Sequence, residues 1–243
     1  VQQGMHMEQA RGAPDGVLTA LQLHGVVACY QGDSERGLAL LEESVTLARQ
    51  RESIGDLADS LNYLARACYQ HDDLARAISL FEQAQNLYQA ANDIMGVATT
   101  HYGLALVRMA QGETDYAAVH LPTCLTHFQR WGDVRFIAAA HDALSKLALA
   151  QGDRAAALAS SCQALRLRQQ MGDKQGLAES IERVASCLDQ PEQAVQLLGA
   201  AAALRQQIGS PVLPIEHKAY QQCISLLREQ LGKEQFSDLW AQG

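Results

Sequence analysis

The chain has 243 residues, and 48% of them are hydrophobic, which is enough for a sizeable core. Its net charge of −8, from 19 basic and 27 acidic side chains, argues against nucleic-acid binding by this segment. No apolar run approaches the length of a membrane span, and no signal peptide is visible, although a cut start would hide one. Six cysteines without a CxxC pattern predict buried free thiols in a reducing compartment, so we expect a cytoplasmic protein.

Small residues recur every 40 residues and form three columns. The columns are Gly25, Ala65, Ala105 and Ser145; Gly37, Ala77, Ala117 and Ala157; and Ser44, Ala84, Cys124 and Ala164. Helix axes approach to about 8 Å only where the residues at the contact are small. A fixed period of this size is typical of a helical solenoid, in which each repeat packs against its neighbours.

Each unit of 40 residues reads as two helices joined by a turn. In the second unit, apolar residues fall at three- and four-residue spacing over residues 57–70 and again over residues 74–90. Turn signals such as Gly32-Asp33 and Gly132-Asp133 separate the helical stretches. Glycine is suited to ending one helix and aspartate to capping the next, so the pattern predicts an all-α fold.

A fifth, shortened unit and a terminal segment follow the four regular units. Ala194, Leu198 and Ala201 repeat the earlier pattern three residues early. Beyond Pro214, one more amphipathic stripe and a short aromatic segment fit the element that covers the last apolar face of a solenoid. We therefore predict an α-α superhelix of about five helical hairpins with C-terminal capping helices.

The predicted domain organisation has a repeat region over residues 1–214 and capping helices over residues 215–243. Residues 1–11 are in register with the end of a second helix and read as the tail of a truncated repeat. The alternative is a vector-derived or disordered leader. The complete repeats are expected at 12–55, 56–96, 97–136, 137–176 and 177–214.

No convergent set of groups for catalysis or for binding a cofactor or a metal stands out. Gly232-Lys233 lacks the upstream glycine of a phosphate-binding loop and is followed by glutamate. His101 and His141 share a register, but no further metal ligand repeats with them, so packing is the preferred interpretation. Acid–base catalysis needs two positioned groups in a cleft, and no such pair is singled out. We expect no catalytic residue, no cofactor and no metal, and therefore not an enzyme.

The inner face of the first helices is the remaining candidate surface. Side chains outside the small columns point there by register, and they combine donors, an acceptor and aromatic rings: Asn62, Arg66, Tyr69, Tyr102, Asp142 and Lys146. Such a set in a superhelical groove suits a protein, a peptide or a small ligand, with Arg66 as the first anchor for a carboxylate. A solvated groove without a ligand is the open alternative.

The repeat resembles the tetratricopeptide repeat (TPR). Leu64-Ala65, Ala77, Phe81 and Ala84 match the Leu-Gly, Ala, Phe and Ala spacing of that family. The period of 40 departs from its usual length of about 34 residues, which implies longer helices or linkers. The resemblance implies a TPR-like solenoid with a protein or peptide partner.

The end of the chain resembles a narrower group. Residues 194–243, with QAVQLLGAAAALRQQIGSPVLP and LGKEQFSDLWAQG, are similar to the C-terminal end of large bacterial ATP-dependent regulators, including LuxR-type transcriptional regulators. In these proteins an ATPase module precedes a helical-repeat sensor, so the resemblance implies the sensor part of a bacterial signalling or transcriptional regulator. It also allows a small-molecule effector. A free-standing adaptor or scaffold and a peptide-pheromone receptor are the alternatives, and the oligomeric state stays open.

Overall fold

The computed structural model describes residues 14–243, and this part of the chain is helical throughout, with no strand. The prediction of an all-α fold is confirmed for it. The tail of a truncated repeat, expected over residues 1–11, lies outside the described residues. Contacts divide the chain into two compact units, one ending at Val107 and including residues 213–215, the other comprising residues 108–212 and 216–243.

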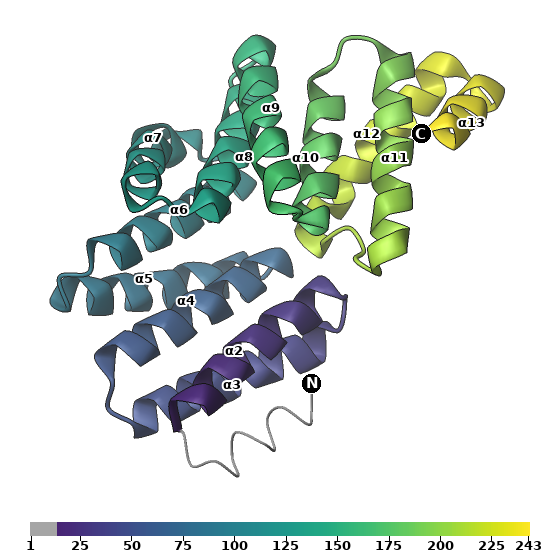
Figure 1. The fold of residues 1–243 in the computed structure, drawn as a ribbon. Coiled ribbons are helices and arrows are strands. Elements are labelled where there is room, and N and C mark those ends of the chain that lie inside the picture. The colour runs from purple at the N-terminus through teal and green to yellow at the C-terminus, as the bar shows by residue number, and fades with distance from the viewer. Residues whose placement is uncertain (1–13) are drawn as a thin grey trace. The chain divides into compact units, whose positions relative to one another are not determined.

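The first unit is built from antiparallel helical hairpins (Figure 1). α2 packs against α3, and α4 packs against α5. The two hairpins join because α4 also contacts both α2 and α3. The helices are α2 (Pro14–Tyr30), α3 (Ser34–Gln50), α4 (Ile54–Gln70), α5 (Leu74–Ala90) and α6 (Ile94–Ala110), the last of which runs past the end of the unit.

The second unit continues the same pattern and adds two terminal helices. α8 packs against α7 and α9, and α10 packs against α8, α9 and α11. Its helices are α7 (Thr114–Trp131), α8 (Val134–Ala150), α9 (Arg154–Met171), α10 (Lys174–Cys187), α11 (Pro191–Ile208), α12 (Pro214–Leu231) and α13 (Lys233–Gln242). The division into repeats from 12–55 to 177–214 stays a prediction, because helix bounds do not define where one repeat ends.

A residue with left-handed backbone lies in the turn after each helix from α2 to α9. Glycine takes this conformation at positions 32, 112, 132, 152 and 172, with φ between +67° and +85°. Glu52, Asp72 and Asn92 take it at the three other turns, with φ of +55°, +64° and +55°. These positions follow one another every 20 residues, so the 40-residue repeat consists of two halves of equal length.

Aspartate caps the helix that follows many of these turns. The carboxylates of Asp73, Asp133, Asp153 and Asp173 each accept a hydrogen bond from a backbone N–H in the first turn of the next helix. Such a bond satisfies one of the N–H groups that a helix start leaves without an intrahelical partner. The capping expected from the Gly-Asp pairs is therefore present at Asp133, Asp153 and Asp173, and the expectation is wrong at Asp33, whose side chain forms no cap hydrogen bond with α3.

The small-residue columns lie at close helix contacts. All of their members are buried, and most have no exposed surface. A Cβ on Gly37 would collide with Sγ of Cys29, and a Cβ on Gly25 would lie 3.0 Å from the carbonyl oxygen of Gly37. Only glycine allows α2 and α3 to approach so closely at these two positions.

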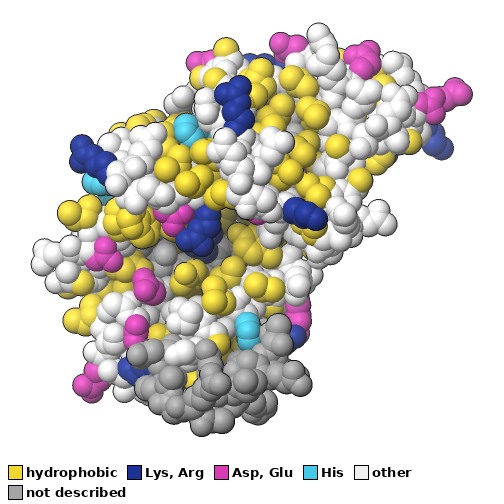
Figure 2. Space-filling model, in the orientation of Figure 1, with side chains coloured by type: hydrophobic (Ala, Val, Ile, Leu, Met, Phe, Trp, Pro, Cys, Tyr) yellow, Lys and Arg dark blue, Asp and Glu magenta, His cyan; other side chains and the backbone are white. Residues whose placement is uncertain are grey.

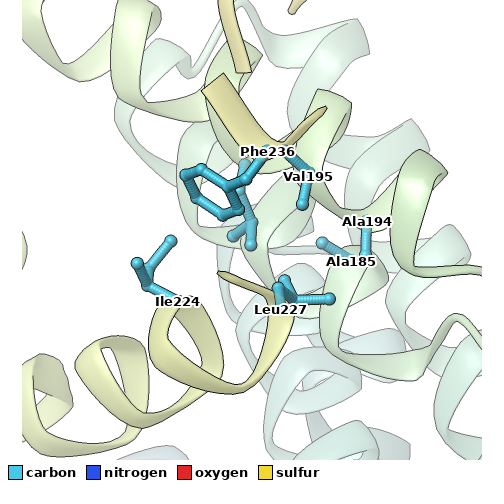
Figure 3. Packing of buried hydrophobic residues seen from close by; sticks show 7 residues of the cluster. Ala185, Ala194, Val195, Ile224, Leu227 and Phe236 are labelled. Carbon is cyan, nitrogen blue, oxygen red and sulfur yellow. The ribbon is translucent and has the colours of Figure 1, made fainter. Parts of the chain in front are cut away.

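The terminal helices cover the last hairpin, as expected for capping helices. Ile224 and Leu227 of α12 and Phe236 of α13 share one buried cluster with residues of α10 and α11 (Figure 3). A Cβ on Gly199 of α11 would collide with the carbonyl oxygen of Trp240, so α13 approaches the backbone of α11 directly. The cap therefore removes apolar surface of α10 and α11 from water.

We expect Glu52→Gly to stabilise the protein by about 0.5–1 kcal/mol, because glycine adopts the left-handed conformation without a Cβ clash. The reciprocal change Gly152→Glu should destabilise it by a similar amount, although no neighbouring atom lies within 4 Å of the added Cβ. Midpoints of urea unfolding at unchanged m-value measure both effects. Identical midpoints for parent, Glu52→Gly and Gly152→Glu would contradict the prediction.

Candidate functional site

Three of the six predicted site residues lie on one face of α4 in the first unit. Asn62, Arg66 and Tyr69 are spaced by four and three residues, which brings them together on the helix surface. Asn62 is only 8% exposed, and no hydrogen-bond donor among residues 14–243 reaches its Oδ1. A buried acceptor without a partner costs about 1–3 kcal/mol, which makes Asn62 the unusual polar group of this face.

Arg66 lies one helical turn from Asn62 and is half-buried. Within the described part of the chain its guanidinium forms neither a hydrogen bond nor an ion pair. Tyr69 and Tyr102 are also half-buried, and each interacts with other residues. Tyr102 lies on α6 of the same unit. The first unit thus contributes an unpaired acceptor, an unpaired cation and two aromatic side chains.

Asp142, the predicted acceptor on α8, is held inside the second unit. Its carboxylate lies 2.6 Å from the guanidinium of Arg168 on α9 and accepts a hydrogen bond from Ser180 Oγ at 3.2 Å. Arg168 is 8% exposed and also contacts the carboxylate of Glu179 at 3.2 Å. Burial alone would lower the pKa of Arg168, but the carboxylates of Asp142 and Glu179 raise it above its usual value. The arginine stays charged, and Asp142 neutralises it.

Comparison of Arg168 with the equivalent residues of the other second helices explains why position 142 has a carboxylate. The corresponding position in the three earlier second helices is buried and uncharged, as Ala48, Tyr88 and Phe128. In the fifth hairpin Arg205 takes this place and is bound through two N–H groups by Glu182, at 2.6 and 2.8 Å. Comparing second helices at one register would have shown both arginines in the sequence. Asp142 and Glu182 are their counter-ions, with side chains 13% and 15% exposed.

Lys146, the second predicted residue on α8, is an anchor for the C-terminal helix. It forms an ion pair with Glu216 in the first turn of α12, and Arg183 of α10 lies 3.5 Å from the same carboxylate. Burial would raise the pKa of Glu216, but Lys146 and Arg183 lower it to about 2. A ligand of Lys146 would therefore compete with α12.

The described residues offer few groups for metal binding or thiol chemistry. Among residues 14–243 no cluster of three His, Cys, Asp or Glu side chains could hold a metal ion. All six cysteines are free, and burial raises the pKa of Cys29 and Cys68 to about 11. Lysine and arginine side chains stand apart from one another on the face seen in Figure 2.

The helices of residues 14–243 are all too short or too polar to cross a membrane.

Comparison with known proteins defines the class of fold. The sequence model of the family described as Tetratricopeptide repeat matches residues 16–90. The crystal structure of BtubC from P. vanneervenii covers 85% of this chain and 89% of its own, with a TM-score of 0.59 and 18% identity. TPR-like repeats of a Podosopora anserina kinesin light chain cover 84% of this chain and 96% of their own, with a TM-score of 0.51 and 18% identity. The predicted TPR-like fold of the α-α superhelix class is confirmed.

Two further similarities are with a Rap protein and with proteins named as transcriptional regulators. A Rap protein complexed with Competence and Sporulation Factor covers 96% of this chain and 69% of its own, with a TM-score of 0.69 and 13% identity. Proteins named as HTH-type transcriptional regulators in Mycobacterium bovis and Mycobacterium tuberculosis are 39% identical over 72 residues. That match spans 28% of this chain and 8% of each regulator.

We expect Arg168→Leu to destabilise the protein by about 3–5 kcal/mol, because it leaves the carboxylate of Asp142 buried without its counter-ion. Adding Asp142→Asn should recover part of this loss, since the double variant buries no unpaired charge. Arg166→Leu, at an exposed position of the same helix, should stay within about 0.5 kcal/mol of the parent. Denaturant unfolding compares the four proteins, and a double variant that is no more stable than Arg168→Leu would refute the pairing.

The contacts of Glu216 predict a specific dependence of stability on pH. Its pKa falls from 4.5 to about 2 on folding, so its ion pairs stabilise the protein above pH 4.5, and this contribution is lost as the pH falls toward 2. Glu216→Gln should therefore lower the free energy of unfolding by about 1–2 kcal/mol at pH 7, with a smaller difference in acid. Glu229→Gln, at an exposed position of α12, is the control. A difference between parent and Glu216→Gln that stays constant from pH 7 to pH 2 would contradict the assignment.

Proposed function

We propose that the chain is a non-enzymatic interaction and sensor domain of a bacterial signalling or transcriptional regulator. TPR-like hairpins are an interaction scaffold, because stacked repeats present an extended surface to a partner. The partner that we propose is a protein or peptide segment bound along the first helices, at Asn62, Arg66, Tyr69 and Tyr102. A small-molecule effector at the same surface is part of the proposal.

The observation that carries this proposal is the buried, unpartnered Oδ1 of Asn62 beside the unpaired guanidinium of Arg66. A backbone N–H of a bound peptide would satisfy the acceptor of Asn62. A carboxylate of the same peptide would form a charge-assisted pair with Arg66. Asp142 and Lys146 have partners within the second unit, so we place the bound peptide on the first unit.

The regulator part of the proposal has two supports. The C-terminal stretch resembles bacterial regulators, and the mycobacterial relatives carry that name. The chain aligns with only 8% of each relative. An attached ATPase or DNA-binding module, and the process that such a module controls, are therefore proposed here for the whole regulator. Free, mostly buried cysteines support a cytoplasmic location, and the net charge of −8 supports a segment that leaves nucleic acid to other modules.

A peptide-pheromone receptor is the second candidate. The Rap protein complexed with Competence and Sporulation Factor favours it, because that fold covers 96% of this chain. A receptor of this kind would bind a short free peptide, whereas a regulator sensor or an adaptor would bind a segment within a larger protein. The length and the free ends of the bound peptide separate the candidates.

Binding of a synthetic peptide library with free carboxyl termini to the full chain tests the proposal. Arg66→Ala should weaken the binding of selected peptides by about tenfold or more, the loss expected for one charge-assisted hydrogen bond. The melting temperature should change by less than about 2 °C, because Arg66 has no ion pair to lose.

Arg49→Ala, at an exposed position of α3, is the matched control and should bind as the parent does. Selected peptides that bind the parent and Arg66→Ala equally, or that lose affinity only with Arg49→Ala, would overturn the assignment of the surface. A library from which the parent selects no peptide would overturn peptide binding itself.

A further inference from the structure

The first and last helices of the repeat region differ in how their apolar side chains are covered. In the second unit, α12 and α13 cover the apolar residues of α10 and α11. On α2 of the first unit, Leu23 and Val27 are 55% and 51% exposed. They are four residues apart and so share one face of the helix. Two large apolar side chains at this exposure need an explanation.

The registers of Val27 and Ala20 are buried in every later hairpin, and the register of Leu23 is buried at Gly103 and Ala143 and half-buried at Tyr63 and Arg183. The equivalents of Val27 are Ala67, Val107, Leu147 and Cys187, and none is more than 6% exposed. The equivalents of Ala20, which is half-buried, are Ser60, Thr100, Ala140 and Ser180, and all four are 0% exposed. The exposed face of α2 is therefore the face that first helices bury in the other repeats.

The structure shows what covers this face where it is buried. Gly103, in the register of Leu23, lies against the ring of Phe81 on α5, the second helix of the preceding hairpin. Ser60, in the register of Ala20, accepts a hydrogen bond from Gln22 on α2, the first helix of the preceding hairpin, at 2.9 Å. Both helices of a preceding hairpin thus contribute to the cover.

We propose that the face formed by Ala20, Leu23 and Val27 is a docking surface for a further helical hairpin of the same repeat type, preceding α2 in the polypeptide. Its second helix would lie on Leu23 and Val27, and its first helix on Ala20. Phe81 fits at this register because the residue that it meets, Gly103, has no side chain. Leu23 fills that space in α2, so the docking helix has a side chain smaller than phenylalanine opposite Leu23.

A chimera tests this proposal. In this chimera a second copy of residues 14–53 replaces residues 1–13 and is joined directly to Pro14. The copied α3 then packs against the original α2 in the same way that the original α3 packs against α4. This hairpin is suitable because α3 packs beside α4, which carries the large side chain of Tyr63 at the register of Leu23. Hydrogen exchange of the α2 amides should slow by about tenfold or more in the chimera, because α2 is then packed on both sides.

Leu23→Ser with Val27→Ser, made only in the original α2, should reverse this protection in the chimera and change the parent much less. Leu226→Ser is the matched control, because Leu226 is 58% exposed on α12 and should affect both proteins equally. A second chimera with a copy of residues 54–93 should protect α2 less, since its Phe81 would meet Leu23 instead of a glycine.

Three results would overturn the proposal. The first is unchanged exchange of α2 in the chimera, including a chimera in which the added hairpin does not fold. The second is an equal effect of the Leu23 and Val27 substitutions in parent and chimera. The third is a parent that sediments as a dimer and becomes monomeric with these substitutions, which would identify the occupant as a second copy of this chain.

Discussion

The rest of this structure depends on the distance to which neighbouring helices can approach. A single helical hairpin leaves one apolar side open, and it buries that side only by stacking on the next hairpin. Glycine, alanine and serine at the crossings let the helices approach closely, and the collision of a Cβ on Gly37 with Cys29 shows how little space is left between α2 and α3 within one hairpin. The small columns therefore determine the spacing of neighbouring helices, and the spacing determines which other side chains remain accessible.

That spacing also determines which polar residues can serve a ligand. On α4, Asn62 and Arg66 lie beside the packed columns and have no internal partner among the described residues. On α8, Asp142 and Lys146 occupy the equivalent registers but neutralise charges brought by α9 and α12. The same two registers thus hold polar groups that are available to a ligand on α4 and counter-ions on α8. The difference arises because α9 and α12 bring charged side chains to the residues of α8.

Most of the fold could be predicted from the sequence because it depends on local and repeated signals. Helix periodicity, Gly-Asp turns and small columns each recur at a fixed register, so every repeat supports the interpretation of the others. The partners of the site residues could not be read in this way. Glu216 is 70 residues from Lys146, and nothing in the repeat pattern places α12 beside α8. The exchange of Phe128 for Arg168 at one register was a visible signal, and it points to Asp142 as a counter-ion.

The arginines at this register also make hairpins of nearly equal shape distinguishable from one another. If α9 were to pair out of order with α4 or α6, its buried guanidinium would face Asn62 or Tyr102 in place of Asp142, and the charge would have no counter-ion. Such a mispaired state loses several kcal/mol relative to the correct one. An array of similar repeats is exposed to swapped and misthreaded pairings during folding. The buried Arg–carboxylate pairs give the fourth and fifth hairpins a chemical identity that penalises those errors.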